Sequence, residues 1–182
     1  MNKSVVILAS GTGSLTSAII ESGIDGHIAA VVSDKPNSEV LQRAAAAGIS
    51  TYVVPMERDR QIWNEKLLSL FRRLDPDLVI SAGFMRILPN DFVRNFKTIN
   101  SHPSLLPKFP GAHAVRDALR SGEKVTGCTI HWVDEGLDSG PIITQVEIPI
   151  QAGESEVDLH ERIKIVERKL IVRTINWILG EL

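Results

Sequence analysis

About the first hundred residues alternate between short runs of β-branched and apolar residues and longer segments with helical periodicity. Strands that are covered on both faces read as continuous apolar runs, whereas the helices between them carry apolar residues on one face. This alternation predicts βαβ units with right-handed crossovers, and hence an α/β domain with a Rossmann-like, mostly parallel central sheet flanked by helices. The strands are expected at 4–9, 27–33, 50–54 and 78–81, and the helices at 15–22, 38–47 and 59–74.

The second half of the chain continues with a different order of elements. Ser155 and Asp158 have the spacing of a helix N-cap and its partner, and Gly127 is expected to permit a bulge in its strand. No internal repeat or linker interrupts the sequence, so the 182 residues are expected to form one domain. Strands are expected at 96–102, 125–133 and 141–148, a short helix at 114–121, and a long C-terminal helix at 155–179.

Charge and cysteine content narrow the class of protein. The 22 acidic residues against 20 basic residues give a net charge of −2, and no long basic run is present, so a nucleic-acid partner is not expected. The single cysteine, Cys128, cannot form an intrachain disulfide and suits a reducing compartment. No apolar stretch is long enough to span a bilayer, and the sequence begins without a secretory signal. We therefore expect a cytoplasmic protein with no membrane partner.

The stretch from Asn100 to Pro107 contains the most suggestive polar side chains. A strand that continues to His102 places the side chains of Asn100 and His102 on the same face of the sheet. Pro103 cannot donate to a strand ladder, so both side chains should lie at a strand's carboxyl end, where open α/β sheets bind ligands. An amide beside a titratable ring suits a reaction in which an oxygen gains negative charge. The alternative is a strand end whose histidine only caps a turn.

A glycine-rich turn, Ser10-Gly11-Thr12-Gly13-Ser14, joins the first strand to the first helix. This arrangement aims backbone N–H groups at an anion. It is not a complete dinucleotide fingerprint, because Thr16 stands where the third glycine belongs, and it lacks the lysine of a P-loop. The turn therefore either binds a single phosphate through its N–H groups and the Ser14 hydroxyl, or only tightens the connection.

Two further loops contain residues of interest. The loop 83–89 follows a strand and presents several apolar side chains, which either pack in the core or form a slot for a flat, apolar ligand ring. The loop 134–140 carries three carboxylates, and such acidic loops are usually just solvated.

Four motifs occur together in a fixed order. AGFMRIL, NSHPSLLP, PKFPGAHA and GLDSGPII occupy residues 82–88, 100–107, 107–114 and 136–143. On these motifs the chain resembles the folate-dependent formyltransferase superfamily, and the resemblance covers nearly the whole chain. The SGTGS segment at 10–14 narrows the resemblance to the phosphoribosylglycinamide formyltransferase family.

The resemblance implies a single-domain formyltransferase fold and a specific reaction. The family transfers a formyl group from 10-formyltetrahydrofolate to the primary amine of glycinamide ribonucleotide in purine biosynthesis, without a metal. Asn100, His102 and Asp138 match the catalytic amide, imidazole and carboxylate of the family. The amide N–H and a protonated imidazole stabilise the oxyanion that forms when the amine attacks, and the carboxylate favours the imidazolium and assists proton transfer.

The resemblance also implies where the two substrates bind. We expect residues 1–99 to form the phosphate-binding half and residues 100–182 the catalytic half with the folate loop. Leu15 stands where the family often has asparagine, so phosphate binding must rely on backbone N–H groups, and Lys164 stands where the family often has glutamine. The residues that match the ribonucleotide site are Gly11, Thr12, Gly13, Ser14, Leu15, Pro103 and Glu167, whose carboxylate matches the ribose-binding acid. The residues that match the folate pocket are Met85, Arg86, Ile87, Leu88, Val133, Asp134, Glu135, Gly136 and Leu137, with Arg60 facing the glutamate tail.

Three other readings compete with this one. Formyltetrahydrofolate hydrolase and methionyl-tRNA formyltransferase share the folate chemistry, but they usually carry an additional domain that is not expected within 182 residues. The non-enzymatic alternative is a Rossmann module that binds a nucleotide without catalysis. No property of such a module would depend on His102 or Asp138. The last is an inactive scaffold, which is disfavoured because all three catalytic-type residues are present. The protein is expected to act as a monomer or a homodimer on small-molecule substrates.

Overall fold

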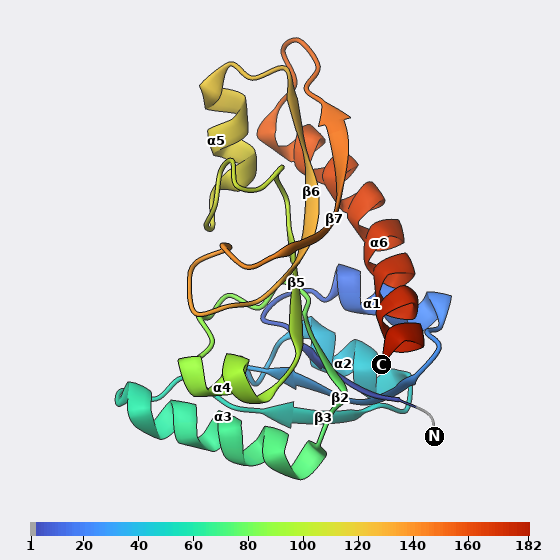
Figure 1. The fold of residues 1–182 in the computed structure, drawn as a ribbon, viewed down its shortest axis with the longest axis vertical. Helices are drawn as coiled ribbons and strands as arrows, with labels where there is room; N and C mark the ends of the chain where they lie inside the picture. Colours follow the sequence, from blue (N-terminus) through green and yellow to red (C-terminus); the bar gives the residue numbers. More distant parts are fainter. Residues whose placement is uncertain (1–2) are drawn as a thin grey trace.

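One twisted sheet of seven strands forms the centre of residues 3–182, which are the residues that the computed structural model describes (Figure 1). The strands are β1 Ser4–Leu8, β2 His27–Ser33, β3 Ser50–Val53, β4 Leu78–Ser81, β5 Thr98–His102, β6 Val125–Trp132 and β7 Ile142–Pro149. Their order across the sheet is β3-β2-β1-β4-β5-β6-β7. The first five strands in this order, β3-β2-β1-β4-β5, pair in parallel, and β6 and β7 continue the sheet antiparallel. The predicted mostly parallel α/β sheet is therefore confirmed.

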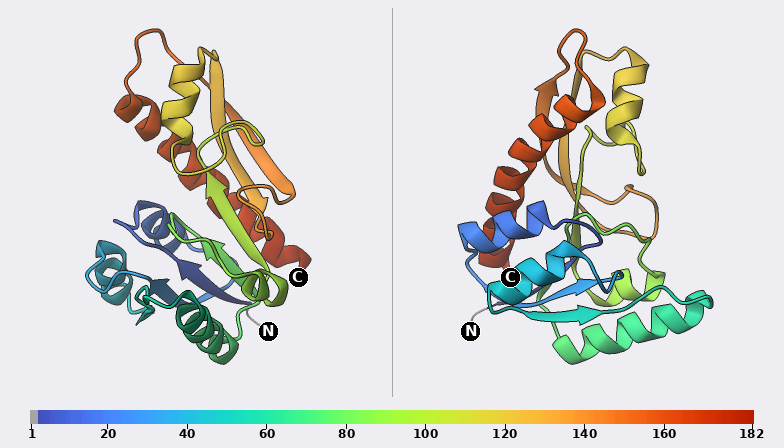
Figure 2. Two further views of the ribbon diagram at one scale, coloured as in Figure 1. Left: turned by 90° about the vertical axis from the view of Figure 1, so that its left-hand side faces the viewer. Right: turned by 180° about the vertical axis from the view of Figure 1, so that it is seen from behind.

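Helices cover both faces of this sheet. They are α1 Ser14–Ser22, α2 Glu39–Ala46, α3 Arg60–Leu74, α4 Asn90–Asn95, α5 Ala114–Ser121 and α6 Glu156–Glu181. Helices α3 and α4 lie on one side of the parallel strands, and α1 and α2 lie on the other (Figure 1). The long helix α6 runs beside β6 and β7 and reaches back to α1 (Figure 2). Its N-cap is formed as predicted, because the Ser155 hydroxyl accepts the Asp158 N–H.

Alternating side chains of the buried strands build two separate cores. In β1, Val5 and Ile7 point to the face covered by α1, α2 and α6, whereas Val6 and Leu8 point to the face covered by α3 and α4. All four are fully buried. This is why β1 has a continuous apolar sequence, since both of its faces exclude water.

Two details of the fold differ from the sequence-based expectations. Helix α4 was not predicted, although its Phe92 is fully buried and packs edge-on against Phe71 with ring centroids 4.7 Å apart. The predicted bulge at Gly127 is wrong, because the β6–β7 register shifts between Ile130 and His131 instead. Glycine is required at 127 for another reason: a Cβ atom there would lie 2.2 Å from the Val146 carbonyl oxygen.

The carboxyl ends of the parallel strands lie along one edge of the sheet, and the loops that follow them are tied together. The Ser10 N–H donates to the Gly83 carbonyl, and the Ser10 hydroxyl accepts the Met85 N–H at 2.9 Å. These bonds join the glycine-rich turn after β1 to the loop after β4. The site described below is built on this edge, as expected for an open α/β sheet.

Candidate active site

Strand β5 delivers the amide and the imidazole that the sequence singled out. Because side chains alternate along a strand, Asn100 and His102 share one face and Ser101 points to the other. The His102 ring is almost fully buried, and its Nε2 lies 2.8 Å from the Phe109 carbonyl oxygen. A carbonyl can only accept, so Nε2 carries a hydrogen in this arrangement. The other ring nitrogen, Nδ1, is therefore the one that can serve a substrate.

The carboxylate of Asp138 reaches His102 from the loop between β6 and β7. Asp138 has a left-handed backbone with φ 51°, a conformation that aspartate tolerates better than most residues. Its Oδ2 accepts the Gly111 N–H at 2.8 Å and lies 3.4 Å from His102 Nδ1. The predicted trio of Asn100, His102 and Asp138 is thus brought together from two distant parts of the chain.

A second histidine, His131, completes this cluster and was not singled out from the sequence. It lies directly opposite Asn100 in the β5–β6 pairing, and its Nε2 is 3.2 Å from Asn100 Nδ2 and 3.7 Å from Asp138 Oδ1. Its Nδ1 donates to the Trp132 carbonyl at 2.9 Å. Burial lowers the pKa of His131 below its ordinary value, which favours the neutral ring, although the Trp132 carbonyl and Asp138 oppose this. A neutral His131 with hydrogen on Nδ1 accepts one Asn100 N–H through Nε2.

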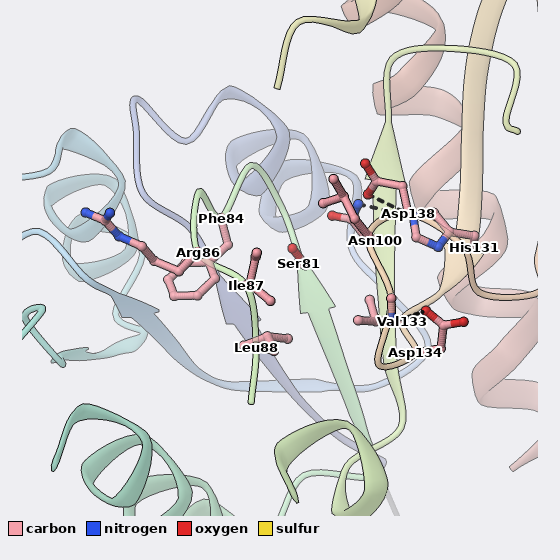
Figure 3. Close-up of a pocket in the computed structure, with 12 residues that line it drawn as sticks. Ser81, Phe84, Arg86, Ile87, Leu88, Asn100, His131, Val133, Asp134 and Asp138 are labelled. Carbon is pink, nitrogen blue, oxygen red and sulfur yellow. Dashed lines mark hydrogen bonds and ion pairs between the residues drawn. The ribbon is translucent and has the colours of Figure 1, made fainter. Parts of the chain in front are cut away.

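Two cavities meet at this cluster. The smaller, of about 120 Å³, is lined on one side by the loop after β4 and on the other by the loop after β6 (Figure 3). The larger, of about 280 Å³, is lined by His102, Pro103 and the 111–115 segment. Four residues line both cavities, and they are Phe84, Asn100, Leu137 and Asp138. A reaction between two bound molecules can therefore take place where Asn100 and Asp138 face both.

Most of the residues that match the folate pocket line the smaller cavity, but three do not. Met85 lines the larger cavity, and Glu135 forms an exposed ion pair with Arg94 at 2.6 Å. Arg60 lies beside the smaller cavity, where its guanidinium stacks 4.4 Å from the Trp63 ring centroid and donates to the Ile87 carbonyl. The matching residues that line the smaller cavity are Arg86, Ile87, Leu88, Val133, Asp134, Gly136 and Leu137.

The glycine-rich turn has the geometry of an anion site. Gly13 is the N-cap of α1 with φ 77°, and a Cβ atom there would lie 2.5 Å from the Val40 side chain. Within residues 3–182, no acceptor takes the backbone N–H groups of residues 12–15. Leu15 is buried in the core, so its side chain supplies no polar group and only its backbone N–H can donate. The turn lines neither cavity, but Ser10 connects it to the floor of the larger one through Met85.

Glu167, the predicted ribose-binding acid, lies on α6 behind β5. It borders neither cavity, but it accepts a hydrogen bond from Ser101 at 2.5 Å, and Ser101 lines the larger cavity. Burial raises the pKa of Glu167, while the hydrogen bond from Ser101 and the nearby Lys164 and Arg168 act in the opposite direction. Lys164 itself pairs with Glu161 at 2.7 Å. Ser101 is thus the link between this carboxylate and the site.

Among residues 3–182, no helix is both long enough and apolar enough to cross a membrane. The same residues contain no group of three or more His, Cys, Asp or Glu side chains that could hold a metal ion.

Known proteins resemble this chain over nearly its full length. The family model described as formyl transferase matches residues 3–175. The phosphoribosylglycinamide formyltransferase of Mycobacterium tuberculosis is 43% identical over 177 residues, covering 94% of this chain and 82% of the relative. That of Escherichia coli is 39% identical, covering 95% of this chain and 85% of the relative. Glycinamide ribonucleotide transformylase 1 from Symbiobacterium toebii has a crystal structure that matches with a TM-score of 0.94 at 34% identity, over 99% of this chain and 89% of that one. This chain therefore belongs to the formyl transferase family and, within it, to the phosphoribosylglycinamide formyltransferases.

Proposed function

We propose that this protein transfers the formyl group of 10-formyltetrahydrofolate to the primary amine of glycinamide ribonucleotide in purine biosynthesis. The observation that carries this proposal is the junction of the two cavities at Asn100 and Asp138. A formyl donor in one cavity and an amine in the other meet at these two side chains. The family membership supports the choice of both substrates.

The smaller cavity suits the folate. Ile87, Leu88 and Val133 give it apolar walls for the flat pteridine ring, and the backbone of the 133–138 segment offers polar groups for the ring edge. At the opposite end, Arg60 and Arg86 provide positive charge for the carboxylates of the glutamate tail. The formyl group then lies beside Asn100.

The larger cavity suits the ribonucleotide. His102 and Pro103 line it, and Ser101 connects it to Glu167, the residue that we assign to the ribose hydroxyls. The phosphate is held at the turn 11–15 by backbone N–H groups and the Ser14 hydroxyl. This assignment directs the primary amine toward Asn100 and Asp138.

The chemistry follows from the side chains that surround the formyl carbon. The amine nitrogen attacks the carbon, a C–N bond forms, and the carbonyl oxygen becomes an oxyanion. The second Asn100 N–H, which His131 does not take, and a protonated His102 Nδ1 stabilise this oxyanion. Asp138, whose Oδ2 lies 3.4 Å from His102 Nδ1, assists removal of the amine proton. The bond from the formyl carbon to the folate nitrogen then breaks, and that nitrogen takes a proton.

An acceptor-dependence assay tests this function. Purified protein with glycinamide ribonucleotide and a formyl-folate analogue should release the deformylated folate, which is followed by absorbance. Release at the same rate with and without the amine would indicate a formyltetrahydrofolate hydrolase instead. No release, with nucleotide binding retained, would indicate a non-catalytic Rossmann module.

We propose that the enzyme acts in the cytoplasm as a monomer or homodimer. Its partners are the two small-molecule substrates, without nucleic acid or membrane. The fully buried Cys128 is compatible with a reducing compartment. We assign phosphate binding to residues 1–99, and catalysis and the folate loop to residues 100–182.

A further inference from the structure

A buried carboxylate lies beneath the arginine at the outer end of the smaller cavity. Asp34 directly follows β2, its side chain is fully buried, and its Oδ2 accepts from Arg86 Nε at 2.6 Å. Its other oxygen, Oδ1, has no hydrogen-bond partner among residues 3–182. A buried carboxylate loses its hydration, so Arg86 provides most of the compensation for that charge.

The guanidinium groups of Arg86 and Arg60 repel each other electrostatically. Burial, and to a smaller extent the positive charge of Arg86, lowers the pKa of Arg60. Arg60 is itself fixed on the Trp63 ring and on the Ile87 carbonyl. Two guanidinium groups repel each other, and the carboxylate of Asp34 offsets this repulsion.

The contact with Asp34 uses Arg86 Nε and leaves the two terminal nitrogens of the guanidinium free. Within the described part of the chain, no acceptor takes a hydrogen from either of them. The Arg86 side chain remains 37% exposed, and it extends away from Asn100 and Asp138 (Figure 3). The two terminal N–H groups are the pair that binds a carboxylate in the bidentate manner.

We propose that Asp34 is a positioning residue: it holds Arg86 beside Arg60 so that the pair binds the carboxylate tail of the folate. This inference rests on the proposed function, because it requires a folate in the smaller cavity. Asp34 lines neither cavity, so we expect it to touch neither the folate nor the reacting atoms. Its loss should therefore weaken tail binding and leave the chemical step unchanged.

The test compares two donors that differ only in the tail: a formyl folate with one glutamate, and the corresponding formyl pteroate without it. In Asp34→Asn, KM for the glutamate-bearing donor should rise about fivefold to tenfold, the size expected for one charge-assisted hydrogen bond at a partly exposed site. KM for the formyl pteroate and kcat with either donor should stay within about twofold of the wild type. Glu39→Gln is the matched control, because it removes a nearby exposed carboxylate on α2 and should change neither KM.

A double-mutant cycle separates positioning from a general structural role. In an Arg86→Ala background, Asp34→Asn should no longer change the ratio of the two KM values, because its target is absent. A rise in both KM values together, or a tail effect that persists without Arg86, would overturn the proposal. Calorimetric binding of the two folates to the wild type and Asp34→Asn gives the same comparison without turnover. A wild type that binds folate but fails to formylate the amine would therefore count against the proposed function alone.

Discussion

Asn100 on β5 and His131 on β6 form a cross-strand pair in which His131 Nε2 lies 3.2 Å from Asn100 Nδ2. Because His131 Nδ1 donates to a backbone carbonyl, the neutral ring has its acceptor on the side of Asn100. This fixes the amide with its N–H groups toward His131 and the cavity. The pair therefore explains how a freely rotating amide is set in the orientation that an oxyanion requires.

Replacing His131 should reduce the sensitivity of the protein to acid. Because burial lowers the pKa of folded His131 below 6.5, the unfolded chain binds the proton more readily. The stabilisation by neutral His131 is thus present above about pH 6.5 and is lost as the pH falls toward the lowered folded value. We expect the Tm of His131→Gln to fall less than that of the wild type between pH 7.5 and 5. His27→Gln, at the exposed start of β2, is the control, and a wild-type slope for His131→Gln would refute the assignment.

His102→Ala should lower turnover much more than it weakens ribonucleotide binding. The imidazole is assigned to the oxyanion, which exists only during the reaction, so its loss acts mainly on kcat. A reduction of kcat by about 10²-fold to 10³-fold is expected for such a group. Calorimetry of glycinamide ribonucleotide binding provides the comparison, and equal losses in kcat and affinity would leave His102 with a binding role only.

Gly13→Ala should weaken binding of the ribonucleotide more than Gly11→Ala. A Cβ atom at 13 requires a left-handed backbone at φ 77° and lies 2.5 Å from Val40, whereas one at 11 meets nothing within 4 Å. The left-handed conformation alone costs about 1–2 kcal/mol for a residue with a side chain. In Gly13→Ala, the dissociation constant for inorganic phosphate and that for the ribonucleotide should each be at least about tenfold higher than in the wild type. Equal effects at both glycines would show that the conformation of Gly13 is not required.

Most of the fold was predictable because its signals are local. The alternation of apolar runs and amphipathic segments predicted the parallel strands and helices α1, α2 and α3. Helix α4 was missed because six residues are too short for helical periodicity, and its stability comes from Phe92 packing against Phe71 of the distant helix α3 and against Phe96 at its own end.

The site was less predictable because its geometry depends on distant pairings. The alternation in β5 placed Asn100 and His102 on one face from sequence alone. His131 was missed because its position opposite Asn100 depends on the register of an antiparallel pair that joins residues 31 positions apart. Asp138 could be selected from its acidic loop only through the family resemblance, since nothing local distinguishes it from Asp134 or Glu135.

Cys128 should resist alkylation in the folded protein. Its thiol is fully buried, and burial raises its pKa to about 12, so the reactive thiolate is scarce at pH 8. Iodoacetamide should leave activity and mass unchanged under native conditions and add one label after denaturation, which serves as the positive control. Rapid labelling of the native protein would contradict the burial of β6.

The ion pair between Asp34 and Arg86 makes an asymmetric prediction about stability. Removal of Arg86 alone leaves a fully buried carboxylate without compensation, whereas Asp34→Asn leaves a partly exposed guanidinium that water can solvate. Arg86→Met should therefore destabilise the protein by about 2 kcal/mol, and Asp34→Asn by less than about 1 kcal/mol. Adding Asp34→Asn to Arg86→Met should restore stability, because it removes the buried charge that Arg86→Met leaves uncompensated. Urea unfolding of the wild type and the three variants measures these differences, with Arg94→Met as a control in an exposed ion pair of the same 2.6 Å length. Additive losses in the double variant would mean that the Asp34 carboxylate is already satisfied without Arg86.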